Sequence, residues 1–128
     1  MPFKSFKIDF FVTSPFEIKF IYITLLSCIA LNVSAQKAGV KKADKNYDKF
    51  AYIDAIKTYE RVAEKGFKTP DMLQKIGNAY YYNADLVNAE KWYGELFAMT
   101  EEVEPEYFFR YAQSLKGVGN YAKADEMM

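Results

Sequence analysis

Residues 70–98, PDMLQKIGNAYYYNADLVNAEKWYGELFA, decide the fold of this chain. Apolar and small side chains recur in them at every third or fourth residue, a rhythm that indicates helices rather than strands. Small residues also return at intervals of 34 or 35 positions, in two series that lie twelve residues apart: Ala55, Ala89 and Ala124, and Ala43, Gly77 and Ala112. Since small residues at fixed offsets let paired helices approach closely, the sequence predicts a stack of similar helical hairpins.

Large side chains follow the same register. They stand four residues after and three residues before the members of the first small-residue series: Tyr59, Tyr93 and Met128, and Tyr52, Leu86 and Tyr121. We expect these side chains to fill the space beside the small ones.

Start and stop signals divide the region after residue 36 into three hairpins. The predicted helices are 38–49 and 52–65, 70–83 and 86–99, and 105–117 and 120–128. Gly66 suits the left-handed conformation that ends a helix. Residues 69–71 (Thr-Pro-Asp) supply a cap, a first-turn proline and an acidic side chain, and residues 104–106 (Glu-Pro-Glu) open the third hairpin by similar logic. The predicted fold class is therefore all-α.

The middle hairpin resembles a tetratricopeptide repeat, a helix–turn–helix unit of about 34 residues. The resemblance rests on Leu73, Ile76, Gly77, Tyr80, Leu86, Ala89, Tyr93 and Leu96. The third hairpin is similar, through Phe108, Tyr111, Ala112, Leu115, Gly119, Tyr121 and Ala124. The first hairpin is the most divergent, since Asn46 occupies the position of a large apolar residue.

This resemblance implies a tetratricopeptide-like domain over 36–128, with repeats at about 38–66, 69–101 and 104–128. The third repeat stops inside its second helix, so the domain would be a short right-handed solenoid of about 2.5 repeats. Because a solenoid needs a polar closing face, an end at Met128 predicts that the chain is a fragment of a longer protein.

The first 35 residues are of a different kind. Phe20 to Leu31 form an apolar run of twelve residues after Lys19, and small residues stand at Val33 and Ala35. This pattern is typical of a secretory signal peptide that is cleaved after Ala35, and the run is short for a membrane span. Residues 1–18 are an aromatic-rich preface, which suggests a misannotated start with translation beginning near residue 18.

Two other readings of this segment stay open, a retained anchor and a lipoprotein. Residues 25–28 (Leu-Leu-Ser-Cys) loosely match a bacterial lipobox, in which Cys28 would carry the lipid, although Cys28 lies inside the apolar run rather than at its end. Cleavage after Ala35 would remove the only cysteine of the chain, and the mature protein would then have no disulfide or thiol chemistry.

The composition argues against catalysis. The 128 residues include no histidine, which excludes Ser-His-Asp and Cys-His mechanisms and most zinc sites. Neither a P-loop nor a dinucleotide-binding glycine motif occurs, and 17 basic against 17 acidic residues give no excess charge for nucleic acid. The acidic residues of 101–106 lack the spacing of a calcium loop and indicate a solvated helix start. We expect no enzyme activity, cofactor, metal or small-molecule substrate.

In tetratricopeptide solenoids the first helix of each hairpin lines a concave face, and the resemblance implies a partner-binding groove there. Carried over by register, the groove residues are Asp44, Tyr47, Gln74, Lys75, Asn78, Tyr81, Tyr82, Phe109, Arg110, Gln113 and Lys116. Lys75 and Arg110 share one register position with Lys41 and could form a basic edge, whereas Tyr80 holds a core position. Amide, phenol and cationic groups predict an extended peptide or a partner helix as the ligand. A terminal carboxylate is a poor candidate, because Gln74 stands where a lysine would help.

The amino-acid sequence of the repeats also resembles that of the N-terminal region of exported OmpA-like cell-envelope proteins of Gram-negative bacteria. The resemblance implies a protein–protein interaction scaffold in the periplasm, associated with the outer membrane only through domains beyond residue 128 or through a lipid on Cys28. Two alternatives stay open: a subunit of an outer-membrane assembly or secretion machine, and an accessory region of an enzyme whose catalytic domain follows.

Overall fold

The computed structural model describes residues 14–128, which form six α-helices and no strand. The helices are α2 (Pro15–Asp48), α3 (Tyr52–Glu64), α4 (Pro70–Tyr82), α5 (Leu86–Met99), α6 (Pro105–Gly117) and α7 (Tyr121–Glu126). The all-α class predicted from the sequence is confirmed. The chain divides into two compact units, Met1–Ala35 and Gln36–Met128.

Helix α2 is longer than the sequence predicted. It begins at Pro15 rather than near residue 38 and continues through the apolar run without a break. Most residues between 25 and 45 are good or tolerable helix formers, and Gly39 alone does not end a helix, since one interior glycine costs only about 1 kcal/mol. Residues 14–35 are exposed along their whole length. By length and composition α2 could cross a membrane, a property that it shares with signal sequences.

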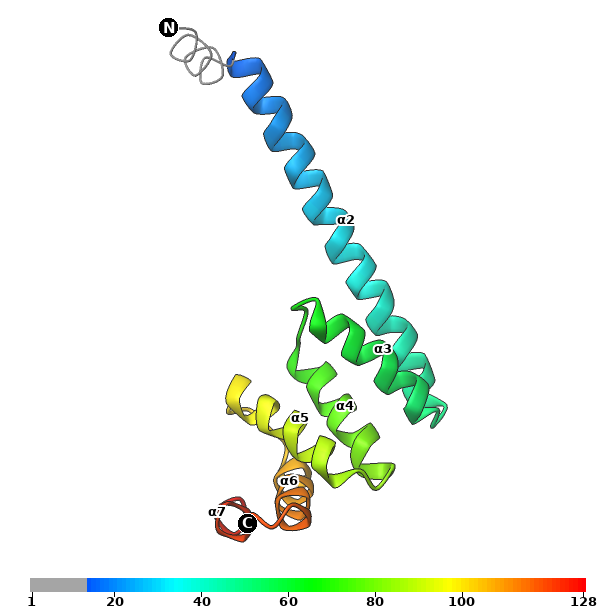
Figure 1. Cartoon of the computed structure of the whole chain (residues 1–128), viewed down its shortest axis with the longest axis vertical. Helices are drawn as coiled ribbons and strands as arrows, with labels where there is room; N and C mark the ends of the chain where they lie inside the picture. The colour runs from blue at the N-terminus through cyan, green and yellow to red at the C-terminus, as the bar shows by residue number, and fades with distance from the viewer. Residues whose placement is uncertain (1–13) are drawn as a thin grey trace, which may run out of the picture. The chain divides into compact units, whose positions relative to one another are not determined.

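Successive helices of the Gln36–Met128 unit pack against one another (Figure 1): α3 on α4, α4 on α5, α5 on α6 and α6 on α7. Helix α4 also contacts α6, so the first helices of two consecutive hairpins are neighbours. Helices α3 to α6 begin and end within one residue of their predicted bounds, and α7 ends two residues early, at Glu126.

Local capping explains the agreement in these bounds. The Thr69 hydroxyl accepts a hydrogen bond from the backbone N–H of Met72, as the Thr-Pro-Asp start predicts. Asp85 and Asn120 cap α5 and α7 in the same way. Gly66 adopts the left-handed conformation expected of it, with φ of +84°. Helix α6 also has its proline in the first turn, although Glu104 makes no side-chain cap bond.

The two small-residue series lie in the core, where all their members are buried. Gly77 shows why the register needs small residues: a Cβ there would lie 2.6 Å from Cε1 of Tyr93 on the facing helix α5. The rings of Tyr59 and Tyr93 are fully buried, as predicted, but Tyr121 and Met128 at the last helix are exposed. The register therefore describes the core of the first two hairpins better than that of the third.

Candidate functional site

The predicted groove residues lie on α2, α4 and α6, and the structure gathers several of them into two polar clusters. The Asn78 cluster consists of Tyr47, Asn78, Tyr93, Glu106 and Arg110. The Asp44 cluster consists of Asp44, Tyr59, Asp71 and Lys75.

The Asn78 cluster joins four helices through one amide. The side-chain oxygen of Asn78 accepts hydrogen bonds from the Tyr93 hydroxyl at 2.7 Å and from Nη1 of Arg110 at 2.9 Å. Its Nδ2 donates to the Tyr47 hydroxyl at 3.1 Å. Nη2 of Arg110 in turn donates to Glu106 at 3.0 Å. Asn78 is buried, and most of its hydrogen-bonding capacity is used inside the protein.

The Asp44 cluster repeats this arrangement one hairpin earlier. Oδ1 of Asp44 accepts from the Tyr59 hydroxyl at 2.6 Å and from Nζ of Lys75 at 3.0 Å. Lys75 also pairs with Asp71 at 2.9 Å, four residues before it on the same helix. Burial lowers the pKa of Lys75, but the hydrogen bonds to Asp71 and Asp44 outweigh burial, and the pKa is raised overall.

The two clusters occupy matching register positions. The acceptors are 44 and 78, each followed fifteen residues later by the tyrosine that donates to it, at 59 and 93. The cations, Lys75 and Arg110, come from the first helix of the next hairpin, and each pairs with an acid four residues before it. This side of the helices therefore uses polar side chains to join consecutive hairpins.

The predicted basic edge is consequently neutralised at two of its three positions. Lys75 faces two carboxylates, and Arg110 faces Glu106 and the Asn78 amide oxygen. Lys41, the third member, is exposed on α2.

Aromatic rings form the accessible part of the predicted groove. Tyr82 and Phe109 are about half exposed, at 47% and 54%, whereas Tyr47 and Tyr81 are half-buried. The Arg110 guanidinium lies 5.2 Å from the ring centroid of Tyr82, within the range of a cation–π contact. Its hydrogen-bonding and stacking partners hold this side chain in one place.

The remaining predicted residues, Gln74, Gln113 and Lys116, are half-buried, and no cluster includes them. Tyr80 was expected in the core, but it is only partly buried, and its hydroxyl donates to Glu60 on α3.

The sequence analysis missed four members of the clusters: Tyr59, Tyr93, Asp71 and Glu106. A signal for them was present. Twice in the sequence, a side chain that accepts hydrogen bonds is followed by a tyrosine fifteen residues later and by a cation 31 or 32 residues later.

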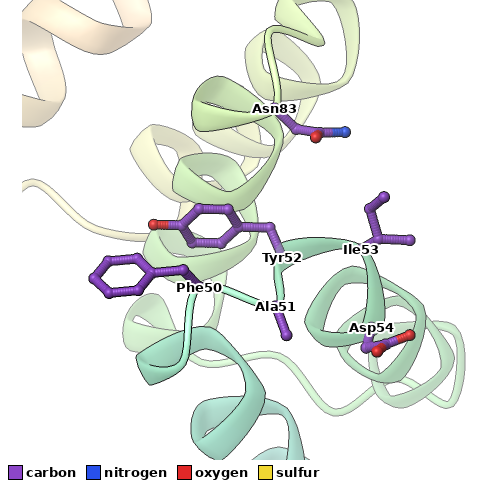
Figure 2. Close-up of a pocket in the computed structure, with 6 residues that line it drawn as sticks. All are labelled: Phe50, Ala51, Tyr52, Ile53, Asp54 and Asn83. Carbon is purple, nitrogen blue, oxygen red and sulfur yellow. The ribbon is translucent and has the colours of Figure 1, made fainter.

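The turn between α2 and α3 carries an open pocket (Figure 2), which is lined by Phe50, Ala51, Tyr52, Ile53, Asp54 and Asn83. Phe50 and Tyr52 extend to the same side, and Ile53 points away from them. Phe50 has a φ of +60° and is exposed, and its register equivalents, Ala84 and Gly119, also have positive φ. Asp54 is the one charged residue of the lining, so this pocket holds no acid–base pair for catalysis.

No protein-family model matches this chain, and no curated protein matches it. Within residues 14–128, no group of three or more His, Cys, Asp or Glu side chains is placed to hold a metal ion. The repeated helices and their surfaces are therefore the features that bear on function.

Proposed function

We propose that residues 36–128 form a tetratricopeptide-like protein–protein interaction module of an exported cell-envelope protein. The observation that carries the proposal is the repetition of one set of side-chain contacts, at intervals of 34 or 35 residues, in consecutive hairpins. Similar hairpins joined through equivalent positions are the construction principle of repeat solenoids, whose extended surfaces serve to bind other proteins.

The partner surface that we propose is the aromatic side of the first helices. Tyr82 and Phe109 have large aromatic side chains that are about half exposed. Rigid aromatic side chains make strong anchors at protein interfaces. The half-buried amides of Gln74 and Gln113 lie on the same two helices, α4 and α6, and would supply hydrogen bonds to an extended peptide or a partner helix.

A binding comparison tests this surface. We expect a Tyr82→Ala/Phe109→Ala variant to lose the specific partners that the unchanged chain recovers from a cell-envelope extract by cross-linking. One buried aromatic anchor is worth about 2 kcal/mol, so the affinity should fall more than tenfold. The matched control is Val87→Ala/Tyr121→Ala, which truncates two exposed side chains on the second helices. Equal recovery by both variants would show that the partner binds elsewhere.

Export is tested by the N-terminus of the mature protein. We expect a Gram-negative host to release a chain that begins at Gln36, because Val33 and Ala35 provide the small side chains that signal peptidase requires. Mass spectrometry of the product checks the prediction. An intact N-terminus in the membrane, or a lipid on Cys28, would instead support the anchor or the lipoprotein.

A further inference from the structure

The second half of α2 carries a stripe of lysines. Lys37, Lys41 and Lys45 on α2, and Lys49 in the turn directly after it, follow one another at intervals of four residues, and each is exposed. Residues four apart lie on the same side of a helix. Ala43, which is fully buried, lies two residues from both Lys41 and Lys45, about 200° around the helix axis. The lysine stripe therefore covers the side of α2 that faces away from the core.

This stripe differs in charge from the exposed surface of α3. Lys42 is exposed beside it, and Asp48 is its one exposed acidic neighbour between residues 36 and 49. Asp44, the other acid of this segment, is bound to Tyr59 and Lys75. On α3, by contrast, the exposed charges are of both signs: Asp54, Lys57, Arg61 and Glu64.

The basic charge of the stripe is also left unpaired. Within residues 14–128, the salt bridges engage Lys68, Lys75 and Arg110, and none engages a lysine of the stripe. The chain as a whole has no net charge. A local excess of cations on one helix side is therefore a feature of α2 rather than of the composition, and it fits a surface of the opposite sign.

We propose that the lysine stripe docks residues 36–128 onto a membrane surface that contains anionic phospholipid. Charge complementarity defines the partner as an array of negative headgroups, since four cations in a row match an extended surface better than a single anion. The position of the stripe favours a membrane over an acidic protein. The stripe begins at Lys37, directly after the apolar part of the same helix, the one described segment with the length and composition to cross a bilayer. A chain that keeps this segment holds the stripe at the membrane, and a chain cleaved after Ala35 would depend on the charge of the stripe alone. Basic residues next to such segments bind anionic headgroups.

Vesicle binding tests the proposal with the chain in the form that a Gram-negative host produces, its N-terminus established by mass spectrometry. Co-sedimentation is compared between vesicles of phosphatidylcholine alone and vesicles with added phosphatidylglycerol. The readout is the ratio of the two partition coefficients, because insertion of a retained apolar helix would raise both. We expect stronger binding to the anionic vesicles, and we expect high salt to abolish this preference.

Matched double variants assign the effect to the stripe. Each surface lysine contributes about fivefold to binding of an anionic membrane, so Lys41→Gln/Lys45→Gln should reduce the ratio about 25-fold. Lys57→Gln/Lys65→Gln, which removes two exposed lysines at α3, should leave it nearly unchanged. Equal binding to both vesicle types, or equal losses in the two variants, would overturn the proposal. Binding to polyglutamate without any preference for anionic vesicles would also overturn it and would assign the stripe to an acidic polypeptide. Failure of the vesicle experiment would not affect the proposal that Tyr82 and Phe109 bind a protein partner.

Discussion

Replacing Asn78 with leucine is expected to lower the free energy of unfolding by about 3 kcal/mol. Leucine has a similar size and a better helix propensity, but it removes the acceptor for Tyr93 and Arg110 and the donor to Tyr47. The fully buried Tyr93 hydroxyl would lose its partner, and an unsatisfied buried group costs about 1–3 kcal/mol. Arg110 and Tyr47 can reach water and should lose less. Urea unfolding followed by circular dichroism measures the difference.

Asn78→Asp is the matched control. A carboxylate can accept from Tyr93 and from Arg110, and the Tyr47 hydroxyl can donate to it instead of accepting. The same combination of a carboxylate, a tyrosine and a cation already exists one hairpin earlier, around Asp44. We therefore expect the aspartate variant to retain most of the stability that the leucine variant loses. A leucine variant as stable as the aspartate variant would mean that the Asn78 cluster does not join the hairpins energetically.

The sequence predicted the helices well because their boundaries are set locally. Thr69 and Gly66 act through neighbouring backbone groups, so the residues themselves show where a helix starts or stops. The start of α2 could not be predicted by the same means. Hydropathy drops near residue 35, but nothing there breaks the backbone hydrogen bonds, and the helix continues.

The candidate site was predicted less well, because its chemistry depends on contacts between helices. The register showed that Asn78 is equivalent to Asp44 but could not show that Tyr93 and Arg110 donate to the Asn78 side-chain oxygen. The exposure of Tyr82 and Phe109 likewise depends on what their neighbours cover. A repeat motif thus predicts which residues are equivalent, whereas packing decides which of them remain available to a partner.

Raising the pH above about 10 is expected to destabilise the folded chain strongly. Burial raises the pKa of Tyr59, as does its hydrogen bond to Asp44, and burial raises the pKa of Tyr93 although the nearby Arg110 opposes it. A raised pKa means that the folded chain holds its phenol protons more tightly than the unfolded chain. The stabilisation is therefore complete below the unfolded tyrosine pKa of about 10 and is lost as the pH rises above it.

Tyr59 and Tyr93 are expected to stay protonated in the folded chain while the same tyrosines ionise in the unfolded chain. Above pH 10 each of them then lowers the free energy of unfolding by about 1.4 kcal/mol per pH unit, or about 3 kcal/mol together at pH 11. Urea unfolding between about pH 8 and 11 measures this slope, and the tyrosinate absorbance of the folded chain reports which phenols remain protonated.

A Tyr59→Phe/Tyr93→Phe variant keeps both buried rings and removes both titrating groups. It should start from a lower stability, since Asp44 and Asn78 each lose a donor, yet its stability should fall less steeply with pH. An unchanged slope in that variant would place the alkaline sensitivity in other groups. A stability that stays flat to pH 11 in the parent chain would contradict the tight burial of Tyr59 and Tyr93.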